Sequence, residues 1–125
     1  MAQINWQKYY PYFKPHEFVC KETGKNGVKA ELLDRLLLLR LEWGKPMIIT
    51  SGYRAPEHSR ERVKKAPGPH TTGFACDVAI GPGSDAWDFT YLAMQHGFKG
   101  IGVSQKAGLP RFIHLDLLDK RLWSY

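Results

Sequence analysis

Two short clusters of histidine and aspartate carry the chemistry that this sequence suggests. His70 and Asp77 are separated by six residues, and His114 is followed two positions later by Asp116. Imidazole nitrogens and carboxylate oxygens are common zinc ligands, and a catalytic zinc site usually has three protein ligands and a fourth position for water. We therefore expect His70, Asp77 and His114 to bind one Zn²⁺, a centre that makes a hydroxide nucleophile at neutral pH.

The first cluster continues into a predicted strand over residues 74–80. Side chains alternate between the two faces of a strand, so Asp77 shares one side with Ala75 and Ala79. These small neighbours leave room for an ion and a substrate. Cys76 points to the other side and is not expected to be a ligand.

The second cluster lies on a predicted strand over residues 111–117. The same alternation places His114 and Asp116 on one face, while the aliphatic residues between them face the core. The remaining histidines considered, His16 and His96, lack acidic or histidine neighbours of this kind. We interpret them as ordinary surface or helix-end residues.

Two helices are predicted to support these strands. A leucine-rich stretch over residues 30–43 has apolar residues at helical spacing, and Gly44 is a suitable stop. A second helix is predicted through His96, with Ser84 as its N-cap and Gly97 just past its end. A short helix is also considered within residues 54–65.

The fold class follows from the order of these elements. Strands are predicted over residues 47–50, 74–80, 101–103 and 111–117, with an aromatic, irregular segment over 1–20 and loops over 21–29 and 66–69. Unevenly interleaved helices and hairpin-length loops favour an α+β fold, with an antiparallel β-sheet and flanking helices. At 125 residues and 14.3 kDa, residues 1–125 are expected to form one domain.

Composition restricts the partners. The net charge of +6 and the pI near 9.4 favour an acidic partner such as nucleic acid, anionic lipid or an anionic cell-wall polymer, or simply a solubilising surface. The sequence has no nucleic-acid-binding motif, no apolar run of membrane-spanning length and no secretory h-region. We expect synthesis in the cytoplasm and no membrane insertion. Cys20 and Cys76 could be free thiols or one disulfide.

The ordered motifs resemble one protein family. They are Thr-Ser-Gly-Tyr-Arg-Ala-Pro-Glu-His (50–58), the segment around His70 and Asp77 (67–78), Gly-Ile-Gly-Val (100–103) and Phe-Ile-His-Leu-Asp (112–116). This set is similar to the zinc D-Ala-D-Ala carboxypeptidases, whose superfamily includes cell-wall endopeptidases and the hedgehog signalling domain. Small phage-encoded members resemble it most, through the segment 17–24 and the final Trp-Ser-Tyr.

This resemblance implies a hedgehog/DD-peptidase-like fold and a site. His70 and Asp77 would be zinc ligands, His114 the third, and Arg54 would lie in the pocket and bind a substrate carboxylate or the developing oxyanion. The alternative for Arg54 is a structural ion pair with Glu57 or Glu61. The implied substrates are peptidoglycan stem peptides, cleaved next to D-amino acids by a monomer that reaches the cell wall by phage delivery or through a holin.

The general base is where the sequence departs from the family. Many relatives have a glutamate three residues before the last zinc histidine, whereas Arg111 occupies that position here. Asp116 is our candidate base, with an orienting partner of a histidine as its alternative role. A catalytically inactive cell-wall-binding or virion structural module of the same fold is the rival function. A DNA-associated protein has only the positive charge in its favour.

Overall fold

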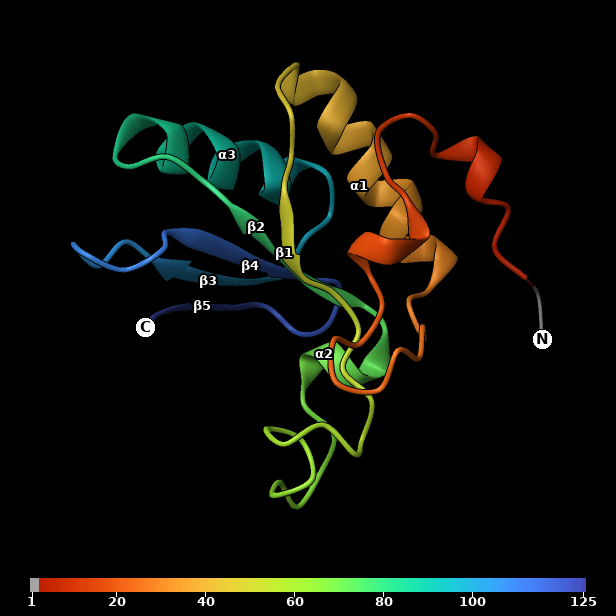
Figure 1. Cartoon of the computed structure of the whole chain (residues 1–125). Coiled ribbons are helices and arrows are strands. Elements are labelled where there is room, and N and C mark those ends of the chain that lie inside the picture. The colour runs from red at the N-terminus through yellow and green to blue at the C-terminus, as the bar shows by residue number, and fades with distance from the viewer. Residues whose placement is uncertain (1–2) are drawn as a thin grey trace.

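A five-stranded sheet and three α-helices form the fold in a computed structural model that describes residues 3–125 (Figure 1). The elements are η1 (Trp6–Lys8), η2 (Pro15–Glu17), α1 (Ala30–Trp43), β1 (Ile49–Ser51), α2 (Pro69–Thr72), β2 (Ala75–Ala79), α3 (Ser84–Gln95), β3 (Gly100–Ser104), β4 (Phe112–Asp116) and β5 (Arg121–Ser124), where η denotes a 3-10 helix. This mixture of helices and sheet confirms the α+β fold.

The strand order is β1-β2-β4-β3-β5. The pairings β1–β2, β2–β4 and β3–β4 are antiparallel, as expected from the sequence. The sequence did not predict β5, which pairs in parallel with β3 at the edge of the sheet. Its four residues are mostly exposed, so they lack the apolar pattern that identifies a buried strand.

Helix α1 has the bounds predicted from its leucines, and Gly44 ends it in the left-handed conformation at φ 71°. Four of these leucines are buried: Leu32, Leu33, Leu36 and Leu39.

The prediction for α3 needs a correction, because Ser84 is already helical and Gly83 is the N-cap. The helix ends at Gln95, with His96 as its C-cap.

The short helix considered within residues 54–65 does not form. That segment is a series of turns, and α2 begins at Pro69, inside the loop predicted over 66–69. The buried carboxylate of Glu61 accepts hydrogen bonds from Lys64, Thr71 and the Gly68 backbone. The segment therefore folds around the Glu61 side chain. Helical periodicity in the sequence does not reveal such an arrangement.

The two faces of the sheet differ. Helices α1 and α3 cover one face (Figure 1), where Cys76, Val78, Ile113 and Leu115 join the apolar core. The N-terminal segment adds buried rings to this core, as predicted, through Tyr9, Phe13 and Phe18. Strand alternation therefore directs Asp77 and His114 to the opposite face.

Cys20 and Cys76 are both buried free thiols, which answers the question that the sequence left open. Across residues 3–125, no helix combines the length and apolar composition needed to cross a bilayer.

Candidate metal centre

His70, Asp77 and His114 meet on the sheet face opposite α1 and α3. One ligand atom from each lies within 4.8 Å of the others, and all three residues are buried. The Asp77 Oδ1 atom is 3.3 Å from His70 Nε2 and 3.0 Å from His114 Nδ1. The structure thus brings together the three residues that the sequence predicted as ligands.

Three elements position these residues. Asp77 on β2 lies directly opposite His114 on β4 in the antiparallel register. His70 comes from α2, which Gly73 ends at φ 82°. The backbone N–H of Arg54 donates to the His70 carbonyl, and the backbone N–H of Lys29 donates to the Gly73 carbonyl. Two separate segments of the chain therefore fix the position of α2.

Each imidazole uses one ring nitrogen for orientation. His70 Nδ1 is 2.8 Å from the Gly52 carbonyl oxygen, which can only accept, so the proton lies on Nδ1 and the Nε2 lone pair faces Asp77. His114 Nε2 is 2.8 Å from Asp116 Oδ2, which assigns the proton to Nε2 and leaves Nδ1 for a metal. Two imidazole lone pairs and one carboxylate therefore converge, and this donor set fits Zn²⁺.

The surroundings of Asp77 favour the ionised form of its carboxylate. Burial raises the pKa of Asp77, but the neighbouring imidazoles of His114 and His70 lower it by more, so that pKa lies below its usual range. Burial lowers the pKa of His114, and contacts with Asp116 and Asp77 reverse this into a net rise. Asp77 is consequently ionised at neutral pH, as metal binding requires.

Asp116 is fully buried and its carboxylate is engaged on both oxygens. Oδ2 accepts from His114 Nε2 and, at 2.6 Å, from Arg121 Nη2, while Oδ1 accepts from the Leu118 backbone at 3.0 Å. Burial would raise the pKa of Asp116, yet these hydrogen bonds give a net decrease. The geometry matches the alternative role considered from the sequence, a partner that orients His114.

Arg54 contacts the segment of His70 through its backbone, which donates to the His70 carbonyl. Its Nη1 is 3.5 Å from Glu61 Oε2, a long contact, whereas Glu57 pairs with Lys25 at 3.2 Å. The ion-pair alternative therefore applies to Glu61 and not to Glu57. A single long contact uses little of the five-donor guanidinium.

Strand β5 adds residues that sequence reasoning missed. The Trp123 ring lies 5.0 Å from the His114 ring, and Arg121 reaches Asp116. The Tyr125 ring lies 6.2 Å from the Trp123 ring, and burial and the charge of Asp77 raise the pKa of Tyr125. The alternation Arg121, Trp123, Tyr125 is a period-2 signal that could have indicated a strand with one functional face.

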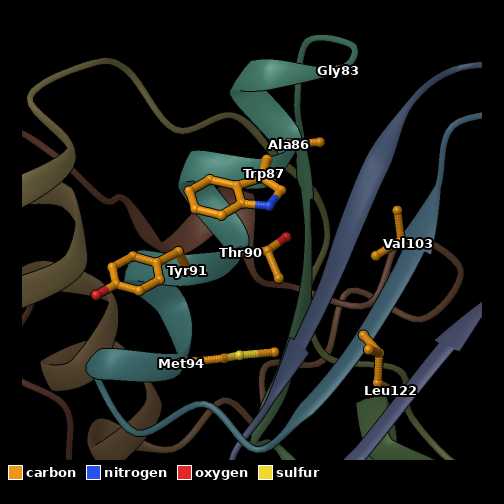
Figure 2. Close-up of a pocket in the computed structure, with 8 residues that line it drawn as sticks. All are labelled: Gly83, Ala86, Trp87, Thr90, Tyr91, Met94, Val103 and Leu122. Atoms are coloured by element: carbon orange, nitrogen blue, oxygen red, sulfur yellow. The ribbon is translucent and has the colours of Figure 1, made fainter.

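A separate apolar cavity of about 430 Å³ lies between α3 and strands β3 and β5 (Figure 2). Its lining comprises Gly83, Ala86, Trp87, Thr90, Tyr91, Met94, Val103 and Leu122. None of these residues belongs to the His–Asp–His cluster. The cavity is on the α3 side of the sheet, so it is distinct from the candidate metal centre.

A family model described as Peptidase M15 matches residues 11–116, most of the chain. The matched span contains His70, Asp77, His114 and Asp116 and ends before β5. No curated protein matches the chain with significance.

Proposed function

Because the chain belongs to the peptidase M15 family, we propose that it is a zinc-dependent peptidoglycan peptidase that cleaves bonds next to D-amino acids in stem peptides. The observation that carries this proposal is the convergence of His70, Asp77 and His114, whose ligand atoms lie within 4.8 Å of one another. A buried set of this composition is what a catalytic zinc site requires.

His70, Asp77 and His114 would hold the ion. Bound zinc supplies Lewis acidity toward a carbonyl and lowers the pKa of water to about 7. The chain's own contribution is orientation: the Gly52 carbonyl holds the Nδ1 proton of His70, and Asp116 holds the Nε2 proton of His114. Both rings are thereby fixed with their second nitrogen toward Asp77.

Arg54 is proposed to bind the terminal carboxylate of the stem peptide or the developing oxyanion. The guanidinium presents a planar fork that matches a carboxylate with two parallel hydrogen bonds. Two observations support this role: the Arg54 backbone donates to the His70 carbonyl, and the charge of Arg54 lowers the pKa of Tyr125 while the charges of Asp77 and Asp116 raise it.

The proposal extends to the setting in which the protein acts. Peptidoglycan stem peptides are its partner, and the monomer reaches the cell wall by phage delivery or release through a holin. The net charge of +6 suits anionic wall polymers. Neither nucleic acid nor a membrane is part of the proposed function.

Zinc content and turnover, measured on the same samples, test the proposal. Wild type should bind one zinc per chain and hydrolyse a D-Ala-D-Ala dipeptide or crosslinked peptidoglycan. His70→Ala and His114→Ala should lose both properties, whereas His16→Ala, at an exposed histidine, should keep them. Full zinc occupancy in the two ligand variants would place the metal elsewhere and refute the site.

A second function has a specific observation in its favour. Arg111 occupies the position at which many relatives have a glutamate that serves as general base. The Asp116 carboxylate already accepts hydrogen bonds from three donors. Both features suit an inactive module that binds the cell wall or serves as a virion structural part. Stoichiometric zinc and peptidoglycan binding without turnover would select this function over the peptidase.

A further inference from the structure

Strand β5 lies two strands away from the ligand strand β4, with β3 between them. Adjacent strands are about 4.8 Å apart, so side chains on β4 and β5 are separated by roughly 9–10 Å of sheet. A side chain on the middle strand would normally fill that space. Any direct contact between β4 and β5 therefore needs a gap in β3.

Two glycines on β3 provide this gap at the register of the metal centre. Gly100 is paired with Asp116 on one side and with Arg121 on the other. Gly102 is paired in the same way with His114 and Trp123. The two glycines thus lie between the two β5 residues and the β4 residues that they contact.

The side chains of β3 and β5 that face α3 show on which face of the sheet Arg121 and Trp123 lie. Figure 2 shows Val103 of β3 and Leu122 of β5 on the side of α3, where both line the apolar cavity. Alternation then directs the neighbours Arg121 and Trp123 to the opposite face. That is the face that carries His114.

The contacts across the gap are direct. Arg121 Nη2 is 2.6 Å from Asp116 Oδ2, the same oxygen that accepts from His114 Nε2 at 2.8 Å. The Trp123 ring is inclined by 50° to the His114 ring at 5.0 Å, and the Arg121 guanidinium lies 4.9 Å from the Trp123 ring centre. Both β5 side chains therefore act on His114, one through Asp116 and one by packing.

Glycine is needed at positions 100 and 102 because the Asp116 and Trp123 side chains occupy the space that a Cβ atom would fill. A Cβ on Gly102 would lie 2.5 Å from Trp123 Cε2, and a Cβ on Gly100 would collide with the Asp116 carboxylate. Neither glycine has a positive φ, so backbone freedom does not explain them. Glycine in a strand interior is otherwise unfavourable, and close approach is a usual reason for it.

We propose that β5 is part of the metal centre, and that Arg121 and Trp123 are positioning residues for His114. Arg121 holds Asp116 in line with His114 Nε2, and Trp123 prevents the imidazole from rotating. The Nδ1 atom of His114 is thus directed at the ion. This inference rests on the zinc site of the proposed function, and it extends the site to a strand beyond the span of the family match.

Zinc affinity, measured by competition with a chelator, tests this inference without using activity. Arg121→Gln and Trp123→Leu should each weaken zinc binding about 10–100-fold, the usual effect of losing a partner that orients a ligand. Arg121→Lys should recover part of the loss, because it restores the charge but not the fork. Leu122→Ala, on the opposite face of the same strand, is the matched control and should bind zinc as wild type does.

A second measurement uses the unaltered protein and so does not depend on the variants folding. Nitrogen-15 chemical shifts of zinc-loaded wild type should show His114 bound to zinc through Nδ1 and protonated at Nε2. Coordination through Nε2 would overturn the inference, as would affinities within twofold of wild type in both Arg121→Gln and Trp123→Leu.

The outcomes separate this inference from the proposed function. If wild type binds zinc, the β5 variants weaken it and no substrate is hydrolysed, the peptidase function fails and the role of β5 stands. If turnover is present and the β5 variants bind zinc normally, the inference fails and the function stands. If wild type binds no zinc, both are refuted.

Discussion

The two histidines of the cluster differ in what holds the nitrogen that faces away from Asp77. A neutral backbone carbonyl holds His70, whereas an ionised carboxylate holds His114. A carboxylate partner makes an imidazole a better donor to a metal. His114 should therefore be the ligand whose strength depends most on its surroundings.

Asp116→Asn tests this dependence. The amide keeps an acceptor oxygen for His114 but loses the charge, so zinc affinity should fall about 10–100-fold. A chelator competition measures it, with Asp119→Asn as a nearby control. If Asp116 is instead the general base, zinc affinity should be unchanged and the rate should fall by on the order of 10²–10⁴.

Arg54→Lys tests the proposed carboxylate contact. An ammonium cannot make two parallel hydrogen bonds, so kcat/KM for a D-Ala-D-Ala peptide should fall about 10–100-fold, the value of a charged hydrogen bond. Zinc content should stay at one per chain. Arg40→Lys on α1 is the control, and equal kcat/KM in both variants would argue against the contact.

Among the elements, α2 is the shortest α-helix and it carries a proposed ligand, His70. Gly73 ends α2 at φ 82°, and a Cβ there would collide with the Gly27 carbonyl. A residue with a side chain costs about 1–2 kcal/mol in this conformation, before any collision. The position of His70 therefore depends on a glycine three residues away.

Gly73→Ala should lower both the free energy of unfolding and the zinc affinity, because the collision displaces α2. Gly108→Ala is a matched control, since Gly108 has φ 79° and open space around its Cβ position. Urea unfolding and chelator competition on both variants separate backbone strain from displacement of His70. Equal losses in the two variants would show that the Gly27 contact is unimportant.

The N-terminal segment is held to α1 by Tyr9, whose hydroxyl donates to Asp34 at 2.7 Å. Burial, the hydrogen bond and the charge of Asp34 raise the pKa of Tyr9 to about 12, from its ordinary value of 10.0. Because the folded state keeps the proton more strongly, this stabilisation is complete below pH 10 and is lost as the pH rises from 10 toward 12.

Tyr9→Phe should therefore cost about 1 kcal/mol of unfolding free energy near pH 7, the typical value of one hydrogen bond. The difference from wild type should shrink as the pH is raised above 10. Urea unfolding at a series of pH values measures it. Tyr10→Phe, at an exposed tyrosine, should match wild type throughout, and a difference for Tyr9→Phe that grows with pH would contradict the sign.

The sequence predicted elements whose pattern is local and missed those that depend on distant contacts. The leucines of α1 and the alternation in β2 and β4 are visible in a short window, and they were sufficient to bring Asp77 and His114 together. The turns around Glu61 depend on its contact with Thr71, and α2 is held by the hydrogen bond from Lys29 to the Gly73 carbonyl. The edge strand β5 depends on its pairing with β3. Local periodicity gives no signal for the turns or for α2, and for β5 it offers only the alternation of Arg121, Trp123 and Tyr125.

Considered as a whole molecule, the protein has its proposed metal ligands on two strands and a helix that are separated in sequence. An ion that binds the folded chain only must stabilise it, by about 2.7 kcal/mol when free zinc is 100 times its dissociation constant. Thermal unfolding with added zinc, and again after chelation, should show this difference. His114→Ala should unfold at the same temperature in both conditions, and a zinc-dependent shift in that variant would contradict the site.

The place of β5 along the chain has a consequence for biogenesis. Chains emerge from the ribosome from the N-terminus onward, so His70 and Asp77 appear well before His114, and Arg121 and Trp123 appear after every ligand. A nascent chain can therefore contain all three proposed ligands and still lack the strand proposed to orient one of them. Because metal affinity depends on folding, the proposed site would bind zinc tightly only after β5 has left the exit tunnel and paired with β3.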